Sequence, residues 1–431
     1  MVPIVRIAPS PTGNLQVGNA RTFLFNWLFA KKHGGKLLLR IEDTDKERSK
    51  VEYEQSIFNG LNWLGINWDN KEPIRQSSRT DLYREHLTRL IKEGSVYEKF
   101  FSDDEKDAIR KDGRTLQDSI LVLRASDENE LVGFDDEIRG RIEVQARHIG
   151  DIAVAKDIDT PLYNFAAVVD DADLGITHVI RGEDHISNTP KQVLIYRALG
   201  APIPHFAHLP LILAPDRSKM SKRHGATSVA EYQNDYLADA FVNFMAHLGH
   251  TYLKEILTRD EMIEGFDLSS VHSSGAIFDE KKLKWINAQY VRKLNPDSFR
   301  SAVKIPEIPD PAIPLITERL EKLSDVNLFR YLWEDPLYEA NLLVWKENTK
   351  EDASNALEEI SKLINQDSLS VESLDELAKK DFDNARGRVY WPLRVALSGS
   401  KTSPGPLEIV AVIGKDAVSR RIHKAIELLS S

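Results

Sequence analysis

The sequence predicts an α/β fold in which a parallel sheet is interrupted by an insertion and followed by a helical second half. Three observations predict it. The first forty residues alternate strand, glycine-containing turn, helix and strand; the strand pattern resumes near Pro161 after a charge-dense stretch; and from Ser228 the spacing of apolar residues is helical. Alternating strands and helices are typical of parallel sheets with helices on their faces.

The first unit is a strand, a helix and a second strand. Val2–Ala8 is short and β-branched, and Pro9–Gly13 has the composition of a turn. Apolar residues then recur at helical spacing, at Ala20, Phe23, Leu24, Trp27 and Leu28. His33–Gly35 ends this helix, and the apolar run Lys36–Ile41 leads into the acidic cluster Glu42–Asp45.

Two more helices are expected before residue 98. One has apolar residues on a single face, at Ile57, Phe58, Leu61 and Leu64. It ends at Gly65, and the next helix ends at Gly94. Residues 98–145 are charge-dense and weakly periodic, which indicates an insertion between two halves of the sheet.

The sheet pattern is expected to resume at Pro161. Apolar Tyr163–Val169 is followed by a turn at Asp170–Asp173, and the short strands are expected at Thr177–Ile180 and Leu209–Leu213. Thr189-Pro190 indicates the start of a helix that ends at Gly200.

Beyond residue 227 the pattern is helical. Ser228–Glu231 matches a capping box. Ile305–Pro314 contains four prolines and is expected to be a linker. The residues after it therefore form a separate helical domain.

Composition limits the class of protein. The chain has 431 residues, 42% hydrophobic and 29% charged, which is enough for about three domains with real cores. It has no cysteine, which excludes disulfides, cysteine-ligated zinc and a cysteine nucleophile. No run of 18 apolar residues and no apolar signal core occur, so we expect a soluble, cytoplasmic protein without membrane contact.

Charge is uneven along the chain. The net charge of −10 argues against a general nucleic-acid binder. Residues 1–50 nevertheless carry nine Lys and Arg against four Asp and Glu, and residues 381–431 carry eight against five. Basic ends of this kind are compatible with a locally held polyanion and also with chance.

Two motifs are suited to phosphates. Pro9–Asn19 brings small residues to a helix N-terminus, where backbone N–H groups and the helix dipole favour an anion. It matches neither the P-loop nor the dinucleotide glycine pattern, and an ordinary turn is the alternative. Arg217, with Lys219, Lys222 and Arg223, places four cations within seven residues; a solvated charged loop is the alternative.

Three further features lie at strand ends or where the sheet resumes. Glu42–Asp45 could hold an ammonium group or cap a helix, and Tyr163 could contact a ligand or pack in the core. Arg181 could bind a carboxylate or form a surface ion pair. His247 and His250 have metal-ligand spacing without an acidic partner, so no zinc site is expected.

In their order along the chain, these features resemble the glutamyl-tRNA synthetase family of class I aminoacyl-tRNA synthetases. The matching stretches are RIAPSPTGNLQVGNARTFLFNWLFAKKHGGKLLLRIEDTD, GLNWLGINWD, PLYNFAAVVDDADLGITHVIRGEDHISNTPKQVLIYRALG, FAHLPLIL, KMSKRHGATSV, SGAIFDEKKLKWINAQYVRKL, and WPLRVALSG with SPGP. The resemblance covers most of the chain and is weakest at residues 98–140 and 315–380.

The resemblance implies a domain order. A Rossmann-like catalytic domain would occupy residues 1–97 and 161–227, with the KMSKR loop at its end, and residues 98–160 would form a connective insertion that binds the tRNA acceptor end. Residues 228–304 would form a helical stem-contact domain, and residues 315–431 a helical anticodon-binding domain.

It also implies a two-step reaction. Glutamate and ATP would form glutamyl-adenylate, usually with tRNA already bound, and the glutamyl group would pass to the 3′ end of tRNA(Glu). Such chemistry depends on positioning and on stabilising negative charge rather than on covalent catalysis.

Residue roles carry over position by position. The catalytic set is Gln16, Gly18, Lys219 and Lys222; the glutamate-binding set is Arg6, Ser10, Glu42, Tyr163 and Arg181; the ATP-binding set is Thr12, Gly18, Asp184, Ile212 and Lys222. Arg6 or Arg181 would pair with a carboxylate, and Glu42 would hold the ammonium group. Lys219 and Lys222 would neutralise the pyrophosphate. Mg²⁺ is expected with ATP, without a protein cage and without protein-bound zinc.

Two departures from the family pattern matter. Gln16 stands where the family signature has His. A Gln amide imitates a neutral imidazole but not an imidazolium, and losing a charge-assisted hydrogen bond costs roughly 1.5–3 kcal/mol, about tenfold to a hundredfold in rate. We therefore expect a slower synthetase. The insertion is short and lacks the cysteine-containing stretch of many relatives, which leaves its grip on the acceptor end open.

Three alternatives remain. One is a glutaminyl-tRNA synthetase, against which the PSPTG and RIEDTD forms argue. Another is the truncated paralogue that glutamylates a modified tRNA base, against which the roughly 200 residues after Arg223 argue. The third is a non-catalytic tRNA-binding descendant, supported by Gln16 alone. The expected partners are L-glutamate and tRNA(Glu), with tRNA(Gln) left open, and the expected state is a monomer.

Overall fold

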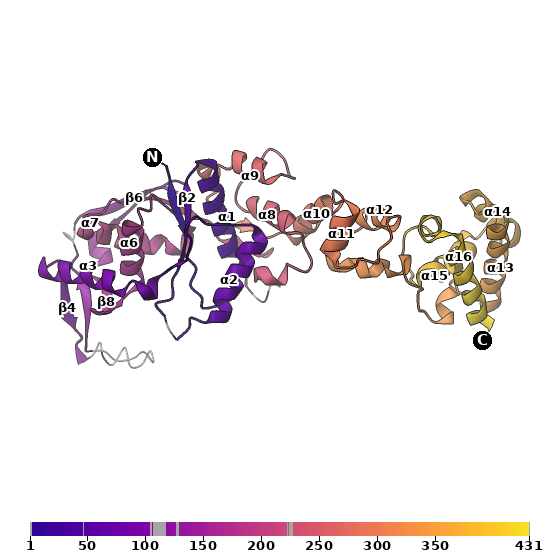
Figure 1. The fold of residues 1–431 in the computed structure, drawn as a ribbon, viewed down its shortest axis with the longest axis horizontal. Helices are drawn as coiled ribbons and strands as arrows, with labels where there is room; N and C mark the ends of the chain where they lie inside the picture. Colours follow the sequence, from indigo (N-terminus) through magenta and orange to yellow (C-terminus); the bar gives the residue numbers. More distant parts are fainter. Residues whose placement is uncertain are drawn as a thin grey trace. The chain divides into compact units, whose positions relative to one another are not determined.

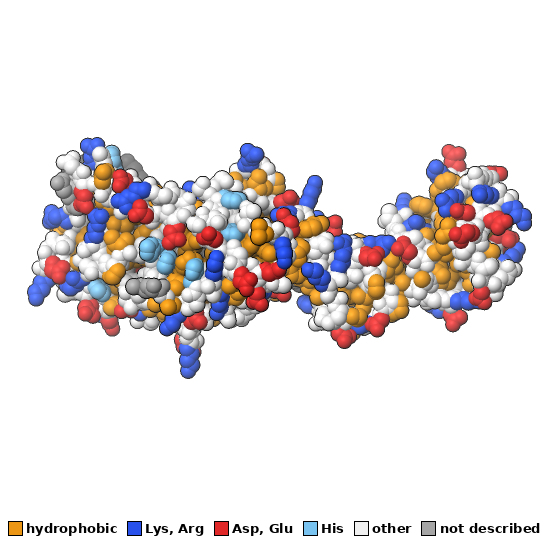
Figure 2. Space-filling model, turned by 90° about the horizontal axis from the view of Figure 1, so that it is seen from above, with side chains coloured by type: hydrophobic (Ala, Val, Ile, Leu, Met, Phe, Trp, Pro, Cys, Tyr) orange, Lys and Arg blue, Asp and Glu red, His pale blue; other side chains and the backbone are white. Residues whose placement is uncertain are grey.

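The computed structural model describes residues 2–430 except 46, 104–105, 107–117, 126–128, 222 and 224–226. The chain divides into two compact units, residues 1–233 with 238–283 and residues 234–237 with 284–431. Within the described ranges, no helix is long and apolar enough to cross a membrane. On the face shown in Figure 2, positive and negative side chains are interspersed, so the negative net charge does not gather there.

The first unit is built on a mainly parallel sheet in which β1 (Ile4–Ile7) is an inner strand. On one side it is followed by β2 (Lys36–Ile41) and β3 (Ile74–Arg75). On the other side lies β10 (His178–Gly182), because the backbone N–H of Thr177 donates to the carbonyl of Ile4 over 2.9 Å. The sheet continues through β11 (His205–Leu209), β6 (Leu131–Asp136) and β7 (Gly140–Gln145), of which only β7 is antiparallel. Strands that leave β1 on both sides create a crevice at their carboxyl ends, where ligands bind in such sheets.

Two helices cover this sheet from opposite faces (Figure 1). Helix α1 (Val17–Lys32) packs against β1, β2 and β10, and α6 (Tyr163–Asp173) covers the other face. In the parallel register Arg6 lies opposite Leu38, so the two-residue period brings Arg6 and Arg40 to the face that α6 covers. That alternation places two arginines beside the acidic end of α6.

The remaining elements of the first unit surround this sheet. The helices are α2 (Val51–Leu64), α3 (Thr80–Lys92), α5 (Ala146–Ile149), α7 (Thr189–Leu199), α8 (Ala238–Ala246) and α9 (Arg259–Gly265). A second, antiparallel sheet has the order β4 (Val96–Phe100), β5 (Ser119–Leu123), β8 (Ile152–Asp157) and β9 (Thr160–Pro161). The short strands β12 (Ile212–Leu213) and β13 (Ala276–Ile277) pair in parallel. Tyr83, Phe165 and Phe206 belong to one buried cluster shared by α3, α6 and the sheet.

The second unit has helices as its main regular elements. After α10 (Glu280–Val291), which begins in the first unit, come α11 (Pro296–Val303), α12 (Ala312–Thr317), α13 (Lys350–Asn365), α14 (Val371–Asp381), α15 (Arg386–Ser398) and α16 (Pro406–Ser430). A buried cluster runs through all of it, from Val291 and Phe299 to Leu429.

Several local predictions are confirmed. Strand β2 has the predicted bounds, and α1 contains the predicted apolar positions. Gly65 and Gly200 end their helices in the left-handed conformation, with φ of 66° and 68°. The combination of a parallel sheet, insertion strands and a helical C-terminal region confirms the predicted fold class.

Two predictions for the resumed sheet are wrong. The apolar run Tyr163–Val169 and the expected turn Asp170–Asp173 together form the helix α6. Phe165–Val169 is buried on every side, so the run lacks the polar face that distinguishes a helix from a buried strand. Leu209–Leu213 is not one strand, because β11 ends at Leu209 and β12 starts at Ile212. Pro210, between them, has no N–H group to donate to a sheet.

The predicted linker and two helix starts also differ. Ile305–Pro314 is packed rather than free: Ile308 is 1% exposed, and α12 starts at Ala312. Thr189 is the first residue of α7 rather than its cap. Ser228–Glu231 leads into a single 3₁₀ turn, Val229–Glu231, instead of a longer helix.

The weakly periodic segment 98–145 contributes strands to both sheets. Its β6 pairs with β11 at Phe206 and Asp136, so part of the predicted insertion extends the central sheet.

Candidate active site

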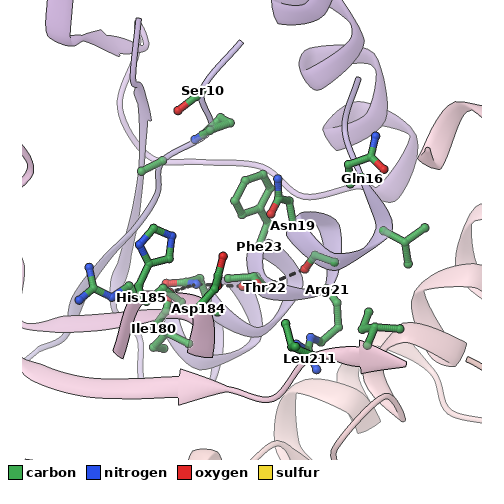
Figure 3. A pocket seen from close by; sticks show the side chains of 18 of the residues that line it. Ser10, Gln16, Asn19, Arg21, Thr22, Phe23, Ile180, Asp184, His185 and Leu211 are labelled. Carbon is green, nitrogen blue, oxygen red and sulfur yellow. Dashed lines mark hydrogen bonds between the residues drawn. The ribbon is translucent and has the colours of Figure 1, made fainter. Parts of the chain in front are cut away.

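A cavity of about 700 Å³ lies at the carboxyl ends of β1, β2 and β10. It is lined by every predicted site residue that the structure describes: Arg6, Ser10, Thr12, Gln16, Gly18, Glu42, Tyr163, Arg181, Asp184, Ile212 and Lys219. Lys222 lies outside the described residues. In Figure 3, Ser10 and Gln16 come from the turn before α1, whereas Asp184 and His185 come from the segment after β10.

Two of the predicted residues that line the cavity, Arg6 and Arg181, are buried arginines, and each is 6% exposed. Nε of Arg6 donates to the Asp171 carboxylate at 3.2 Å. Nε of Arg181 donates to Nε2 of His208 at 3.1 Å, and its Nη2 donates to the Thr189 hydroxyl at 2.8 Å. Among the residues described, no side chain or carbonyl accepts from Nη1 or Nη2 of Arg6, or from Nη1 of Arg181. These N–H groups are available to an anionic ligand.

Asp171, in α6, holds Arg6 and the fully buried Arg40 together. Nη1 of Arg40 donates to the Asp171 carboxylate at 2.5 Å. Burial alone would raise the pKa of Asp171, but Arg6 and Arg40 outweigh it and hold that pKa below its usual value. Asp171 was not among the predicted site residues. The two-residue period of strands puts Arg6 and Arg40 on one face of the sheet, which is a sequence signal for a shared acidic partner. It does not show which residue that partner is, because Asp171 lies far away in sequence.

Glu42 brings the opposite charge to the cavity. Its side chain is 10% exposed, and its Oε1 accepts from Nη2 of Arg40 at 3.0 Å. Burial raises the pKa of Glu42, against the opposing pull of Arg40. A buried carboxylate with one oxygen left for a ligand suits a cationic group such as an ammonium.

Tyr163 and His185 form a polar wall beside Arg181. The Tyr163 hydroxyl lies 3.2 Å from Nδ1 of His185. Burial, followed by the charge of Arg181, lowers the pKa of His185 to about 4, so its ring is neutral at pH 7. Neutral hydrogen-bonding groups beside two cations leave the positive potential of the site intact.

The N-terminus of α1 opens onto the same cavity. Gln16 is the N-cap residue, its side chain does not cap the helix, and its Nε2 donates to the Asn14 carbonyl at 3.1 Å. A Cβ added to Gly18 would meet nothing within 4 Å, so packing within the chain does not require glycine there. No acidic residue occupies the first turn. Free N–H groups and the helix dipole therefore favour an anion at this end.

The cationic segment, residues 217–223, follows β12, and its Lys219 lines the cavity. Lys219 forms an antiparallel bridge with Leu213, and Met220 N donates to the Ile212 carbonyl at 3.2 Å. Arg21, which was not predicted, donates from α1 to the carbonyls of Pro210 and Leu248. It therefore ties the glycine-containing turn to the chain that leads into the cationic segment.

Comparison with known proteins identifies this arrangement. Residues 3–120 and 112–285 match the family described as tRNA synthetases class I (E and Q), catalytic domain, and residues 277–426 match the anticodon binding domain family. The chain belongs to the glutamate–tRNA ligase family of class I tRNA synthetases. As a member of that family the synthetase is an aminoacyl-tRNA ligase, and ATP is its nucleotide substrate.

Individual relatives match over their full length. The synthetase is 38% identical to a glutamate–tRNA ligase of Thermodesulfovibrio yellowstonii, over 98% of this chain and 99% of the relative. It is 37% identical to glutamate–tRNA ligase 2 of Fervidobacterium nodosum, over 99% and 97%. A crystal structure of a glutamate tRNA ligase from Elizabethkingia meningosepticum, in complex with its amino acid, superposes with a TM-score of 0.85 at 31% identity and covers 100% of both chains.

Proposed function

We propose that the synthetase joins glutamate to tRNA(Glu) in two steps. An oxygen of the glutamate α-carboxylate attacks the α-phosphorus of ATP, forming the acyl–phosphate bond as the bond to pyrophosphate breaks. The terminal ribose hydroxyl of tRNA then attacks the carbonyl carbon, loses its proton, and AMP leaves. The protein contributes positioning and charge stabilisation, and no covalent intermediate with a side chain is needed.

The charge pattern of one cavity carries this proposal. Arg6 and Arg181 offer unpaired N–H groups, and Glu42 offers a buried carboxylate. Free glutamate has two carboxylates and one ammonium group, so the lining presents the complementary charges. Glu42 takes the ammonium, a guanidinium takes a carboxylate in the forked geometry that Arg favours, and Ser10 and Tyr163 add hydroxyl groups.

We assign ATP to the α1 side of the same cavity. Thr12 and Gly18 lie on the turn and first helical turn, and Asp184 and Ile212 lie across from them. Open space at Gly18 lets a nucleotide approach the backbone closely. Lys219 and Lys222 neutralise the departing pyrophosphate. Mg²⁺ would be carried by the ATP phosphates, which are its usual ligands in such sites.

Gln16 sets the rate in this proposal. Its amide already donates to Asn14, and an uncharged amide stabilises a developing phosphate charge less than an imidazolium does. Gln16→His is therefore expected to raise kcat by about tenfold to a hundredfold, corresponding to roughly 1.5–3 kcal/mol.

The remaining partners belong to the same proposal. The insertion, residues 98–160, binds the acceptor end; residues 228–304 contact the tRNA stem; and residues 315–431 bind the anticodon. The synthetase acts as a monomer without bound zinc in the cytoplasm. Whether tRNA(Gln) is also a substrate is decided by including it in the assay below.

The test is attachment of radiolabelled glutamate to tRNA(Glu), and in a parallel reaction to tRNA(Gln), with ATP, for the wild-type chain and for Gln16→His. We expect charging that depends on tRNA, and faster charging by the variant. Equal rates would show that Gln16 is an adequate substitute and would contradict the rate argument alone. No charging by either form, with tRNA still bound, would identify a non-catalytic descendant and contradict the proposed function.

A further inference from the structure

Among the described residues, the guanidinium of Arg181 donates only to uncharged groups. Arg181 and His208 are register partners on the neighbouring parallel strands β10 and β11, which puts their side chains side by side. Nε of Arg181 donates to Nε2 of His208 at 3.1 Å, and Nη2 donates to Thr189 at 2.8 Å. Arg6 differs, because it contacts the Asp171 carboxylate directly.

His208 is itself held by Asp136. Nδ1 of His208 lies 2.6 Å from Oδ2 of Asp136, and the His208 backbone N–H donates to the same oxygen at 3.0 Å. An Arg Nε is always a donor, so Nε2 of His208 must accept. The ring proton is therefore on Nδ1 and points to Asp136, which defines one neutral tautomer.

The surroundings keep this ring neutral. His208 is fully buried, and burial lowers its pKa; Arg181 and Arg139 act in the same direction, against Asp136. The rings of Phe134 and Phe206 lie 6.0 Å and 6.2 Å from the His208 ring, measured between centroids. The Arg181 guanidinium lies 5.8 Å from the Phe206 ring centroid. The His208 side chain is therefore enclosed by protein and has no exposed surface.

We propose that Asp136 and His208 form a positioning dyad that fixes Arg181 and leaves its charge and its Nη1 for the carboxylate of the amino acid. The dyad rests on the proposed function, because glutamate is the ligand assigned to Arg181. A carboxylate in direct contact with Arg181 would already neutralise it, whereas a neutral imidazole fixes the guanidinium and keeps Asp136 one side chain away. Glutamine has the same α-carboxylate as glutamate but an uncharged side-chain amide, so the retained charge gives selectivity for glutamate when Arg181 receives the side-chain carboxylate.

Two substitutions of His208 distinguish the loss of its hydrogen-bond acceptor for Arg181 from a change in core packing. His208→Leu removes the acceptor, whereas His208→Gln restores an oxygen near the place of Nε2. His250→Leu is the matched control: His250 is also buried in the first unit, and its Nε2 accepts from the backbone of Asp267 at 3.1 Å, but it does not line the cavity. Melting temperatures show which variants are folded.

The readouts are KM for glutamate, KM for ATP, and the charging ratio of glutamate to glutamine. We expect His208→Leu to raise the glutamate KM by roughly tenfold to a hundredfold, with the ATP KM unchanged and the ratio lowered. His208→Gln recovers most of the loss, and His250→Leu changes neither KM. In the wild-type chain, ¹⁵N spectra of labelled histidine show a ring with Nδ1 protonated and Nε2 unprotonated.

Each contrary result has a separate meaning. Four results would overturn the dyad: an unchanged glutamate KM in folded His208→Leu, an equal rise in both KM values, no recovery in His208→Gln, or a protonated Nε2 of His208. If the wild-type chain still charges tRNA normally, the proposed function stands in each of these cases. A wild-type chain that charges no tRNA contradicts the proposed function and removes glutamate as the ligand of Arg181.

Discussion

The backbone N–H of Val17 donates to the carbonyl oxygen of Thr227 over 2.9 Å. Gln16 and Ser228 form an antiparallel bridge beside it, and Val229 N donates to the Leu15 carbonyl at 2.9 Å. One isolated antiparallel bridge thus joins the start of α1 to the chain that follows the KMSKR segment. On the entry side, Lys219 is bridged to Leu213. Both phosphate-binding segments of the proposed site therefore share one backbone framework.

Glu231 secures the exit side of that framework, because its Oε2 accepts from the backbone N–H groups of Thr227 and Ser228 at 3.0 Å and 2.8 Å. Glu231→Ala is expected to lower kcat about fivefold, the equivalent of about 1 kcal/mol for a lost cap, and to leave the glutamate KM unchanged. Glu231→Gln keeps an acceptor and serves as the control. Steady-state charging kinetics check this; a change confined to the glutamate KM would contradict it.

Asp171 is the structural support of Arg6. Asp171→Asn leaves buried Arg6 without its carboxylate and removes one of the carboxylates that Arg40 contacts, so the free energy of unfolding of the first unit should fall by about 3–5 kcal/mol and the glutamate KM should rise. Asp170→Asn is the matched comparison, since Asp170 binds Arg79, Gln76 and Tyr83 but makes no hydrogen bond to Arg6. Urea unfolding and charging kinetics measure the two effects. Equal glutamate KM values for both variants would show that Asp171 does not position Arg6.

Local signals were enough to predict β2, α1 and the end of α2. Their periodicity and their end residues, such as Gly65, lie within the segment itself. The positions of Glu42 and Arg181 at the cavity followed from strand ends, because parallel strands bring their carboxyl ends to one edge, whereas Arg6 was expected only from the family resemblance.

Partners that lie far apart in sequence could not be predicted in this way. Asp171 and Asp136 reach Arg6 and His208 only through the packing of α6 and the pairing of β6 with β11. Helix α6 was not recognised as a helix because burial on all sides removes its polar face. The proline-rich segment 305–314 is rigid and partly apolar, and Ile308 anchors it in the core.

The second unit depends on a buried arginine. Arg421 is 4% exposed and donates to the carbonyls of Leu397 and Glu334, both at 2.8 Å, and to Asp335 at 3.0 Å. Arg421→Met takes this donor from the Leu397 and Glu334 carbonyls, while Asp335 keeps Arg420, and should lower the free energy of unfolding of this unit by about 3 kcal/mol. The neighbouring, more exposed Arg420 also contacts Asp335, and Arg420→Met should cost less than about 1 kcal/mol. Urea unfolding compares them; equal losses would contradict the role of burial.

Glu42 is expected to lower the stability of the folded chain and to strengthen substrate binding. Because burial raises its pKa in the folded protein, the ionised form is disfavoured there relative to the unfolded chain. Ionised Glu42 therefore lowers the free energy of unfolding. This destabilisation is fully present above the pKa of Glu42 in the folded protein and decreases as the pH falls through that pKa. Glu42→Gln should therefore melt higher than the wild-type chain at pH 8, with a difference that shrinks at a lower, acidic pH. Arg40 keeps its contact with Asp171 in the variant.

The same substitution should raise the glutamate KM by roughly tenfold to a hundredfold at pH 8, because the ammonium group loses a charged acceptor. In the wild-type chain, protonation of Glu42 makes the glutamate KM rise as the pH falls, and Glu42→Gln should lack that rise. Melting curves and charging kinetics at both pH values provide the test. A melting difference that does not change with pH would show that Glu42 titrates alike in the folded and unfolded chains, and an unchanged glutamate KM would remove Glu42 from the ammonium site.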